Sequence, residues 1–339
     1  MPKRRRILIV RPDRVGDVVL MTPLISSLKA SYKDAFIAAL VRRETAPVLE
    51  HNPDLNKILI YYPQISGRKQ VSRIREYDFT DALLLHPTKE LAWLLFFARI
   101  PNRIGVGTIF YQYLTLMRSV PRNYEPIRHE VDYNMDLGRY IGLPQIILTP
   151  SITLLKEERS WAIGYLAECG ITPGDEIIAI NPGSGRSSPN WKIERYIELA
   201  KLLCEAKNIK ILLLGSSKEK KDILPYIDDF PESIIPLYGL SLRALISIIS
   251  QIDILISSST GPMHIASALG KGTISLFCPL PVCNPDRWGP LGNRSSNIFP
   301  TNEFCVDYCP SEPKYCNLEG LTTEMVQSIV WQRLMRPYP

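Results

Sequence analysis

Two carboxylates stand four residues apart in a short polar loop near the start of the chain. The segment Arg11-Pro12-Asp13-Arg14-Val15-Gly16-Asp17 follows an apolar run at residues 6–10 and precedes an amphipathic stretch that ends near residue 29. Aspartate is a favoured N-cap residue, so Asp17 fits a helix cap. It also fits a general base, because a helix dipole holds a carboxylate ionised at this position. The spacing alone favours the cap.

A second loop combines small residues with a cation. The segment Asn181-Pro182-Gly183-Ser184-Gly185-Arg186-Ser187-Ser188 lies between a strand candidate at residues 177–180 and a helix candidate at residues 193–205. Free amides at a helix start suit a phosphate group. The loop is not G-x-G-x-x-G, and Gly270-Lys271 lacks the rest of a Walker A motif, which disfavours nicotinamide enzymes and P-loop NTPases. An anion site and a plain turn both remain open.

Hydroxyl side chains gather in a third loop, Ser257-Ser258-Ser259-Thr260-Gly261, which leads into a helix that carries His264. A helix start with four hydroxyls is another candidate anion cradle. A lone histidine is more often structural, but His264 lies beside this loop, so both roles stay open. A fourth loop, His86-Pro87-Thr88-Lys89, follows a strand candidate and is equally compatible with a solvated turn.

These loops all follow runs with the pattern of buried parallel strands. The first half has strand candidates at residues 6–10, 35–41, 57–61 and 80–85, with helix candidates at 17–29 and 89–98. After a helical connector at 157–169, strand candidates follow at 177–180, 210–214, 252–256 and 273–277, with helix candidates at 193–205, 263–269 and 322–334. This alternation predicts two α/β units with a boundary near residues 155–175. Ligands of such sheets bind at the carboxyl ends of the strands.

Composition limits the class of protein. The chain has 339 residues, of which 45% are hydrophobic and 22% charged, as in globular proteins. Its net charge of +6 is uneven: residues 1–150 hold 22 basic and 14 acidic residues (+8), and the remainder holds 18 and 20 (−2). A basic half beside a near-neutral half predicts that one domain meets an anionic partner.

Neither an export signal nor a membrane span is expected. The apolar run at residues 7–10 is too short for a signal peptide, and the run at 91–98 is too short to cross a bilayer. Reduced thiols are therefore the default for the seven cysteines. Cys305, Cys309 and Cys316 cluster as C-x3-C-x6-C, which lacks the four-ligand pattern of a zinc site. No metal site is expected.

Taken together, these segments resemble glycosyltransferase family 9, the ADP-heptose:lipopolysaccharide heptosyltransferases. Residues 7–24 look like the family's N-terminal motif. The segment Asn181-Pro182-Gly183-Ser184, followed by Trp191 and Glu194-Arg195-Tyr196, is similar to its second motif, and residues 259–270 are similar to its third. The similarity runs in order from about residue 5 to 335 and includes the three clustered cysteines.

The resemblance implies a GT-B fold, an α/β architecture of two facing Rossmann-like domains with doubly wound parallel sheets and an active site in the cleft. Residues 1–160 would bind the acceptor, and residues 161–320 would bind the nucleotide sugar. A C-terminal helix in residues 321–339 would cross back to the first domain. The implied reaction is an inverting, metal-independent transfer that needs no cofactor.

The resemblance also implies roles for single residues. Asp17 matches the family's catalytic base, which reverses the preference for a cap, and Asp13 assists it or positions the loop. The implied donor contacts are Ser184, Gly185 and Arg186 at the diphosphate, Glu219 at the nucleoside, and Thr260, Gly261 and His264 at the phosphate and sugar. In the basic half, we expect Arg14 and Lys89 to contact the acceptor.

Two positions depart from the family pattern. Pro189 stands where the family usually has a lysine, so Arg186 or Lys192 would have to supply the cation near the diphosphate. Ser259 replaces an aspartate that is expected to contact the donor sugar. These changes leave two alternatives open: a different donor, and nucleotide-sugar binding without transfer. A separate alternative keeps the same fold and epimerises or hydrolyses the nucleotide sugar.

The expected partners are ADP-heptose as donor and an acidic glycolipid as acceptor. The expected location is cytoplasmic, at the inner face of the inner membrane. Arg68, Lys69, Arg73 and Arg75 lie near aromatic residues and fit either a solvated face or peripheral contact with anionic lipid. Nucleic-acid binding is not expected, because the basic residues lack a recognisable reading motif.

Overall fold

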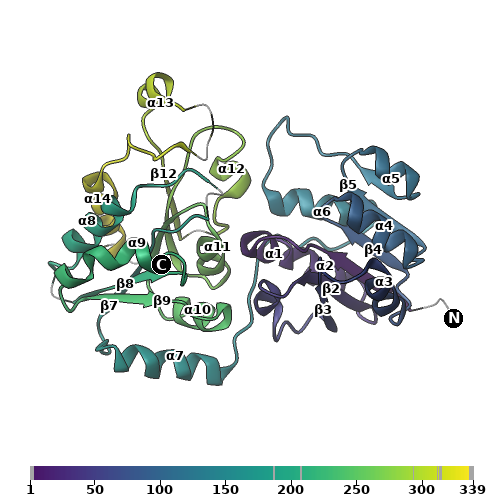
Figure 1. The fold of residues 1–339 in the computed structure, drawn as a ribbon, viewed down its shortest axis with the longest axis horizontal. Helices are drawn as coiled ribbons and strands as arrows, with labels where there is room; N and C mark the ends of the chain where they lie inside the picture. Colours follow the sequence, from purple (N-terminus) through teal and green to yellow (C-terminus); the bar gives the residue numbers. More distant parts are fainter. Residues whose placement is uncertain are drawn as a thin grey trace. The chain divides into compact units, whose positions relative to one another are not determined.

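The chain divides into two units. The computed structural model describes residues 4–335 except for 186, 187, 207, 293, 311, 313 and 314. The division falls between Thr153 and Leu154, and Figure 1 colours unit 1 from purple to blue and unit 2 from teal to yellow. Among the described residues, no helix is both long enough and apolar enough to span a membrane.

Unit 1 is built on a parallel sheet with the strand order β3-β2-β1-β4-β5-β6. The strands are β1 (Arg6–Val10), β2 (Phe36–Arg42), β3 (Lys57–Tyr61), β4 (Asp81–Leu84), β5 (Asn102–Val106) and β6 (Arg118–Val120). Its helices are α1 (Val15–Val19), α2 (Thr22–Ser31), η1 (Ala46–Leu49), α3 (Gly67–Arg75), α4 (Lys89–Phe97), α5 (Phe110–Leu114) and α6 (Glu130–Tyr140).

The central strand β1 shows why this sequence forms a covered sheet. Ile7, Leu8, Ile9 and Val10 are all completely buried, so side chains on both faces of β1 lie in apolar surroundings. A continuous apolar run is typical of a parallel strand with helices on both faces. Burial of each such side chain contributes roughly 1.5–3 kcal/mol.

The helix expected at residues 17–29 is divided into α1 and α2. Proline lacks an N–H group and clashes with the preceding turn, so it is tolerated only in the first turn of a helix. Pro23 lies in the first turn of α2, after α1 has ended at Val19. Helix α1 begins at Val15 with Arg14 as its N-cap residue. Asp17 therefore lies inside α1, and the interpretation of Asp17 as a helix cap is wrong.

Unit 2 repeats the same topology, with the strand order β12-β11-β10-β7-β8-β9. The strands are β7 (Glu176–Asn181), β8 (Ile209–Gly215), β9 (Ile234–Tyr238), β10 (Ile254–Ser258), β11 (Gly272–Leu276) and β12 (Ser295–Ile298). The helices are α7 (Lys156–Glu168), α8 (Ile193–Leu203), α9 (Lys220–Ile223), η2 (Leu224–Asp229), α10 (Leu242–Ile249), α11 (Gly261–Ala268), α12 (Pro285–Trp288), α13 (Asn302–Tyr308) and α14 (Thr323–Met335).

Both sheets therefore have the doubly wound strand order 3-2-1-4-5-6, counted along each unit. In this order the chain direction of the crossovers reverses between the first and fourth strands, which are β1 and β4 in unit 1 and β7 and β10 in unit 2. A crevice opens at such a switch point, on the side of the carboxyl ends of the strands. Loops that follow these four strands are the places to look for a site.

The boundary between the units lies a few residues before the expected position 160. Helix α7 belongs to unit 2 because it packs on α10. Ala162 and Leu166 are buried on α7, and Glu158 pairs with Arg243 of α10 through a 2.7 Å Nη2–Oε2 bond. The helical connector is thus part of the second unit's shell.

The described residues of the last helix pack on α8 and β11 of unit 2. Val326 and Val330 are completely buried in the same apolar core as Ile197 and Ile274. The apolar face of α14 is therefore used within unit 2.

Truncation of Val330 tests the place of α14 in this core. We expect Val330→Ala to lower the free energy of unfolding of unit 2 by about 2 kcal/mol, because it leaves a cavity at a completely buried position. Met335→Ala at the end of the same helix, where the side chain is 79% exposed, should change it by less than about 0.5 kcal/mol. Urea unfolding measures both; equal effects would contradict this packing.

Candidate functional site

In unit 1, polar side chains meet at the switch point between β1 and β4. The loop Arg11–Arg14 follows β1, and His86 follows β4 shortly after Leu84. The two strands are neighbours in the sheet, with Val10 opposite Leu84. The loops predicted from the sequence to carry Asp13, Asp17 and His86 are therefore brought to one edge of the sheet.

Asp17 is a largely buried carboxylate in contact with a buried cation. Its side chain is only 13% exposed, and Arg11, which is 4% exposed, donates to its Oδ1 through Nη2. Burial raises the pKa of Asp17, the nearby charges of Asp13 and Glu130 raise it further, and Arg11 opposes them. The net direction is upward. A raised pKa makes Asp17 a better proton acceptor than an ordinary aspartate.

Helix α6 supplies the other partners of Arg11. Arg11 Nη1 donates to Asn134 Oδ1 at 2.7 Å, and Arg11 Nη2 lies 3.3 Å from Glu130 Oε1. Asn134 also donates from Nδ2 to the carbonyl of Leu20 at 3.0 Å, which ties α6 to the end of α1. No sequence signal points to Glu130 or Asn134, because they lie far along the chain from Arg11 in a segment without a recognisable motif.

Asp13 has different chemistry from Asp17. Its Oδ2 lies 3.0 Å from His86 Nδ1, and its Oδ1 accepts a 2.9 Å bond from the backbone N–H of Arg14. Burial acts to raise its pKa, but the hydrogen bond and charge of His86, together with Arg11, outweigh it and lower the pKa of Asp13 to about 2. A carboxylate held ionised in this way is a weak base, so Asp13 is better suited to fixing the loop than to accepting a proton.

The two cations expected to contact an acceptor are exposed at this same edge. Arg14 is the N-cap residue of α1, and Lys89 is the first residue of α4. Thr88 caps α4 by accepting a 3.3 Å bond from the N–H of Leu91, so the start of this helix is fixed.

In unit 2, the loop after β7 is fixed by its own amide side chains. Asn181 Nδ2 donates to the carbonyl of Gly183 at 2.7 Å, and Asn190 Nδ2 donates to the carbonyl of Pro182 at 2.7 Å. Tyr196 of α8 in turn donates to Asn190 Oδ1 at 2.9 Å. Gly185 has a φ of +55°, a left-handed conformation that favours glycine. The described residues of the predicted anion loop are therefore held by these bonds.

The loop after β10 lies against the loop after β7. Ser188 donates to the carbonyl of Ser259 at 3.0 Å, which joins the two loops at the switch point of the sheet. Thr260 is the N-cap residue of α11, and His264 is buried one turn along this helix. The structure thus brings Ser184, Gly185, Ser259, Thr260, Gly261 and His264 to the same edge of unit 2.

Glu219 joins this group from the end of β8. Its carboxylate packs directly against Gly183, where a β-carbon would overlap it. Its Oε2 also accepts a 2.8 Å bond from the N–H of Ser216, which fixes the carboxylate. A β-carbon at position 183 would therefore displace the Glu219 carboxylate from the loop after β7.

Two cations, Arg186 and Lys192, are expected near a diphosphate. Arg186 lies outside the described residues. Lys192, the N-cap residue of α8, forms a 2.9 Å ion pair with Glu319, and both side chains are more than half exposed. Exposed pairs of this kind contribute about 0–1 kcal/mol, so Lys192 can leave Glu319 for a ligand at little cost.

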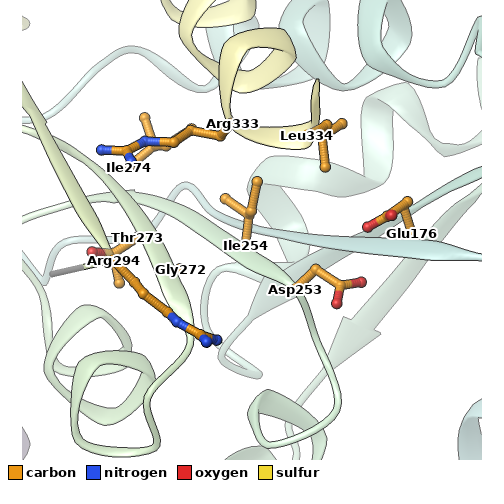
Figure 2. Close-up of a pocket in the computed structure, with 9 residues that line it drawn as sticks. All are labelled: Glu176, Asp253, Ile254, Gly272, Thr273, Ile274, Arg294, Arg333 and Leu334. Carbon is orange, nitrogen blue, oxygen red and sulfur yellow. The ribbon is translucent and has the colours of Figure 1, made fainter. Parts of the chain in front are cut away.

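A separate cavity of about 260 Å³ lies at the other end of the unit 2 sheet. Figure 2 shows its lining, which includes Glu176 at the start of β7, Gly272 at the start of β11 and Arg333 of α14. It contains none of the residues predicted for the donor. Because α/β sheets bind ligands at the carboxyl ends of their strands, we do not assign the donor to this cavity.

The cysteines are free thiols in the structure. Cys278 and Cys283 share a hydrogen bond, which lowers the pKa of Cys278 to about 6. Within the described ranges, no group of three or more histidine, cysteine, aspartate or glutamate residues is arranged to hold a metal ion.

Comparisons with known proteins identify the family of this chain. The family model described as "Glycosyltransferase family 9 (heptosyltransferase)" matches residues 68–315. Lipopolysaccharide heptosyltransferase 2 of Escherichia coli is 26% identical over 312 residues, covering 86% of this chain and 87% of that protein.

Two solved structures share the fold over nearly the whole chain. The family 9 glycosyltransferase of Veillonella parvula superposes with a TM-score of 0.84 at 20% identity, covering 98% of this chain and 97% of that one. The ADP-heptose lipopolysaccharide heptosyltransferase II of E. coli gives 0.81 at 23% identity, covering 97% and 98%. These likenesses confirm the predicted GT-B fold class.

The family model covers well over half of the chain, including the loops that follow β7, β8 and β10. The chain belongs to glycosyltransferase family 9, the heptosyltransferase family, and is a glycosyltransferase.

Proposed function

We propose that this protein transfers a heptose from ADP-heptose to a hydroxyl of a lipopolysaccharide inner-core acceptor, with inversion at the anomeric carbon. The observation that supports this most directly is Asp17, a buried carboxylate with a raised pKa at the switch point of unit 1. The related E. coli enzyme is an ADP-heptose lipopolysaccharide heptosyltransferase, which supports the choice of donor and acceptor.

In the proposed reaction, Asp17 accepts the proton of the acceptor hydroxyl as that oxygen attacks the anomeric carbon. The bond between this carbon and the β-phosphate oxygen breaks, and its electron pair leaves with ADP. A single displacement of this kind inverts the anomeric centre. Asp13 holds the loop in position through His86, while Arg14 and Lys89 bind anionic groups of the acceptor.

The donor would be held by unit 2. We assign the diphosphate to the backbone and hydroxyl groups of Ser184, Gly185 and Thr260, and to the start of α11 at Gly261. Donors aimed at the charge that develops on ADP lower the barrier to its departure. Arg186 and Lys192 would supply positive charge, and Ser259 and His264 would contact the phosphate or sugar. We assign Glu219 to the nucleoside.

A second candidate is binding of a nucleotide sugar without transfer, or with another donor sugar. Pro189 and Ser259 favour it, because they remove a cation and a carboxylate that the family usually carries near the donor. A third candidate, epimerisation or hydrolysis of the nucleotide sugar, would show turnover without an acceptor. Mass spectrometry of products from several nucleotide sugars, with and without a lipid A–Kdo acceptor, separates the three.

We propose that unit 1 also makes peripheral contact with anionic lipid at the cytoplasmic face of the inner membrane. Helix α3 carries Arg68, Lys69, Arg73 and Arg75 and no acidic residue. A cavity of about 860 Å³ between α3 and α4 combines Arg68 and Arg75 with the aromatic rings of Trp93 and Phe97. Cations beside apolar rings suit an amphiphile whose headgroup is negative.

Removal of the base tests the proposed reaction. We expect Asp17→Asn to reduce ADP release from ADP-heptose and acceptor by at least about 100-fold, because a general base contributes 10²–10⁴-fold. Asp34→Asn, at an exposed site in the same unit, should retain full activity. Thermal unfolding verifies that both variants are folded. Wild-type turnover in Asp17→Asn would exclude this residue as the base.

Calorimetry with ADP tests the donor assignment. We expect Glu219→Gln to weaken ADP binding by about tenfold, since a hydrogen bond to a charged group contributes roughly 1.5–3 kcal/mol. Glu198→Gln, an exposed change on α8, should bind ADP as the wild type does. If both variants bind equally well, Glu219 does not contact the nucleoside.

Co-sedimentation with vesicles tests the membrane contact. Arg68→Gln with Lys69→Gln should weaken binding to phosphatidylglycerol-containing vesicles by about 1 kcal/mol for each cation removed. Lys201→Gln with Lys221→Gln in unit 2 removes the same charge and should have little effect. Binding by the wild type should fall as salt rises; salt-insensitive binding would argue against an electrostatic contact.

A further inference from the structure

Glu130 is a charged residue buried inside unit 1, and it has no role in the proposed reaction. It lies in the first turn of α6 and is completely buried. Burial of an ion requires a close partner of opposite charge. Glu130 has two such partners, Arg11 and Arg122, so its place in the structure is set by electrostatics.

The contacts connect Glu130 to Asp17 through one nitrogen atom. Arg11 Nη2 contacts Asp17 Oδ1, and the same nitrogen lies 3.3 Å from Glu130 Oε1. On its other side, Glu130 Oε1 lies 3.1 Å from Arg122 Nη2. The order of charges is therefore Asp17, Arg11, Glu130, Arg122, alternating in sign.

A guanidinium in direct contact normally makes an aspartate a weak base. An opposite charge this close lowers a carboxyl pKa, which would hinder proton transfer to Asp17. The charged groups that face Asp17 are Arg11 from its own loop, Asp13 from the same loop and Glu130 from α6. Only Arg11 lowers the pKa of Asp17, and both carboxylates act against it.

We propose that Glu130 is a positioning residue that offsets the charge of Arg11, so that Asp17 is held in place by the guanidinium and yet stays basic enough to accept a proton. Arg11 orients the Asp17 carboxylate by a charge-assisted hydrogen bond. The negative charge of Glu130 opposes the loss of basicity that the Arg11 charge would cause in Asp17. Arg122 weakens this effect, because it donates to the same Glu130 oxygen and partly neutralises its charge. The inference rests on the proposed role of Asp17 as the base.

A carboxyl titration by NMR of protein with ¹³C-labelled aspartate tests this proposal without any need for turnover. In Glu130→Gln, the charge of Arg11 is no longer offset, so the titration midpoint of Asp17 should move to lower pH than in the wild type. In Glu130→Asp, the charge is kept, so the midpoint should stay nearer the wild-type value. Arg122→Gln removes the cation that partly neutralises Glu130. Glu130 then offsets Arg11 more fully, and the titration midpoint of Asp17 should move to higher pH.

The matched control is Asp136→Asn on the same helix. It also removes one negative charge from α6, but Asp136 pairs with Arg139 at 2.8 Å and with Arg128 instead of with Arg11. Its effect on Asp17 should be small. Kinetics gives a second measurement: kcat of Glu130→Gln should fall roughly three- to tenfold with the acidic limb of the pH profile moved to lower pH, and KM should be little changed.

The outcomes separate the two proposals. Opposite shifts of the Asp17 midpoint in Glu130→Gln and Arg122→Gln would support the charge balance, even if no transferase activity were found. An unchanged midpoint in folded Glu130→Gln, or shifts of the same sign in both variants, would overturn it. Should Glu130→Gln fail to fold, Arg122→Gln still decides, because a purely structural Glu130 predicts no rise of the Asp17 midpoint in that variant.

Discussion

A guanidinium ion buried at the end of β1 is the constraint on which unit 1 depends. An ion removed from water is tolerated only where charges and hydrogen bonds surround it. Arg11 takes these partners from α1 through Asp17 and from α6 through Glu130 and Asn134. The same contacts that neutralise Arg11 therefore fix α6 beside the central strand and aim the carboxylate of Asp17.

Unit 2 meets the opposite requirement, because its proposed ligand is itself an anion. In the part of this unit that the structure describes, neutral groups fix the loops at the switch point: Asn181, Asn190 and Ser188 all bond to backbone carbonyls. Groups that are fixed in this way would need little reorganisation to bind the proposed ligand. A buried ion at this place would compete with the ligand for those groups.

The sequence predicts those elements whose signal is local. Strands β1 to β4 coincide with apolar runs. A motif indicates Asp17, and the family resemblance indicates Glu219. Strand β5 has no such signal, because Arg103 and Gly105 interrupt its apolar run, and the buried Arg103 donates to the backbone carbonyls of Thr115 and Ile100. Glu130 could not be found because its partner Arg11 is 119 residues away. Its charge has a role only in the folded chain.

In the folded protein, part of the positive charge of the basic half is neutralised by internal ion pairs. Several of its arginines are used internally: Arg11 and Arg122 neutralise Glu130, while Arg128 and Arg139 pair with Asp132 and Asp136. These pairs contribute to the fold and add little to the field outside it. Helix α3 has four basic residues and no acid, so its field is unopposed within the helix. The excess of +8 therefore points to α3 and the exposed Arg14 and Lys89, a limited surface suited to phosphate groups rather than to a long polyanion.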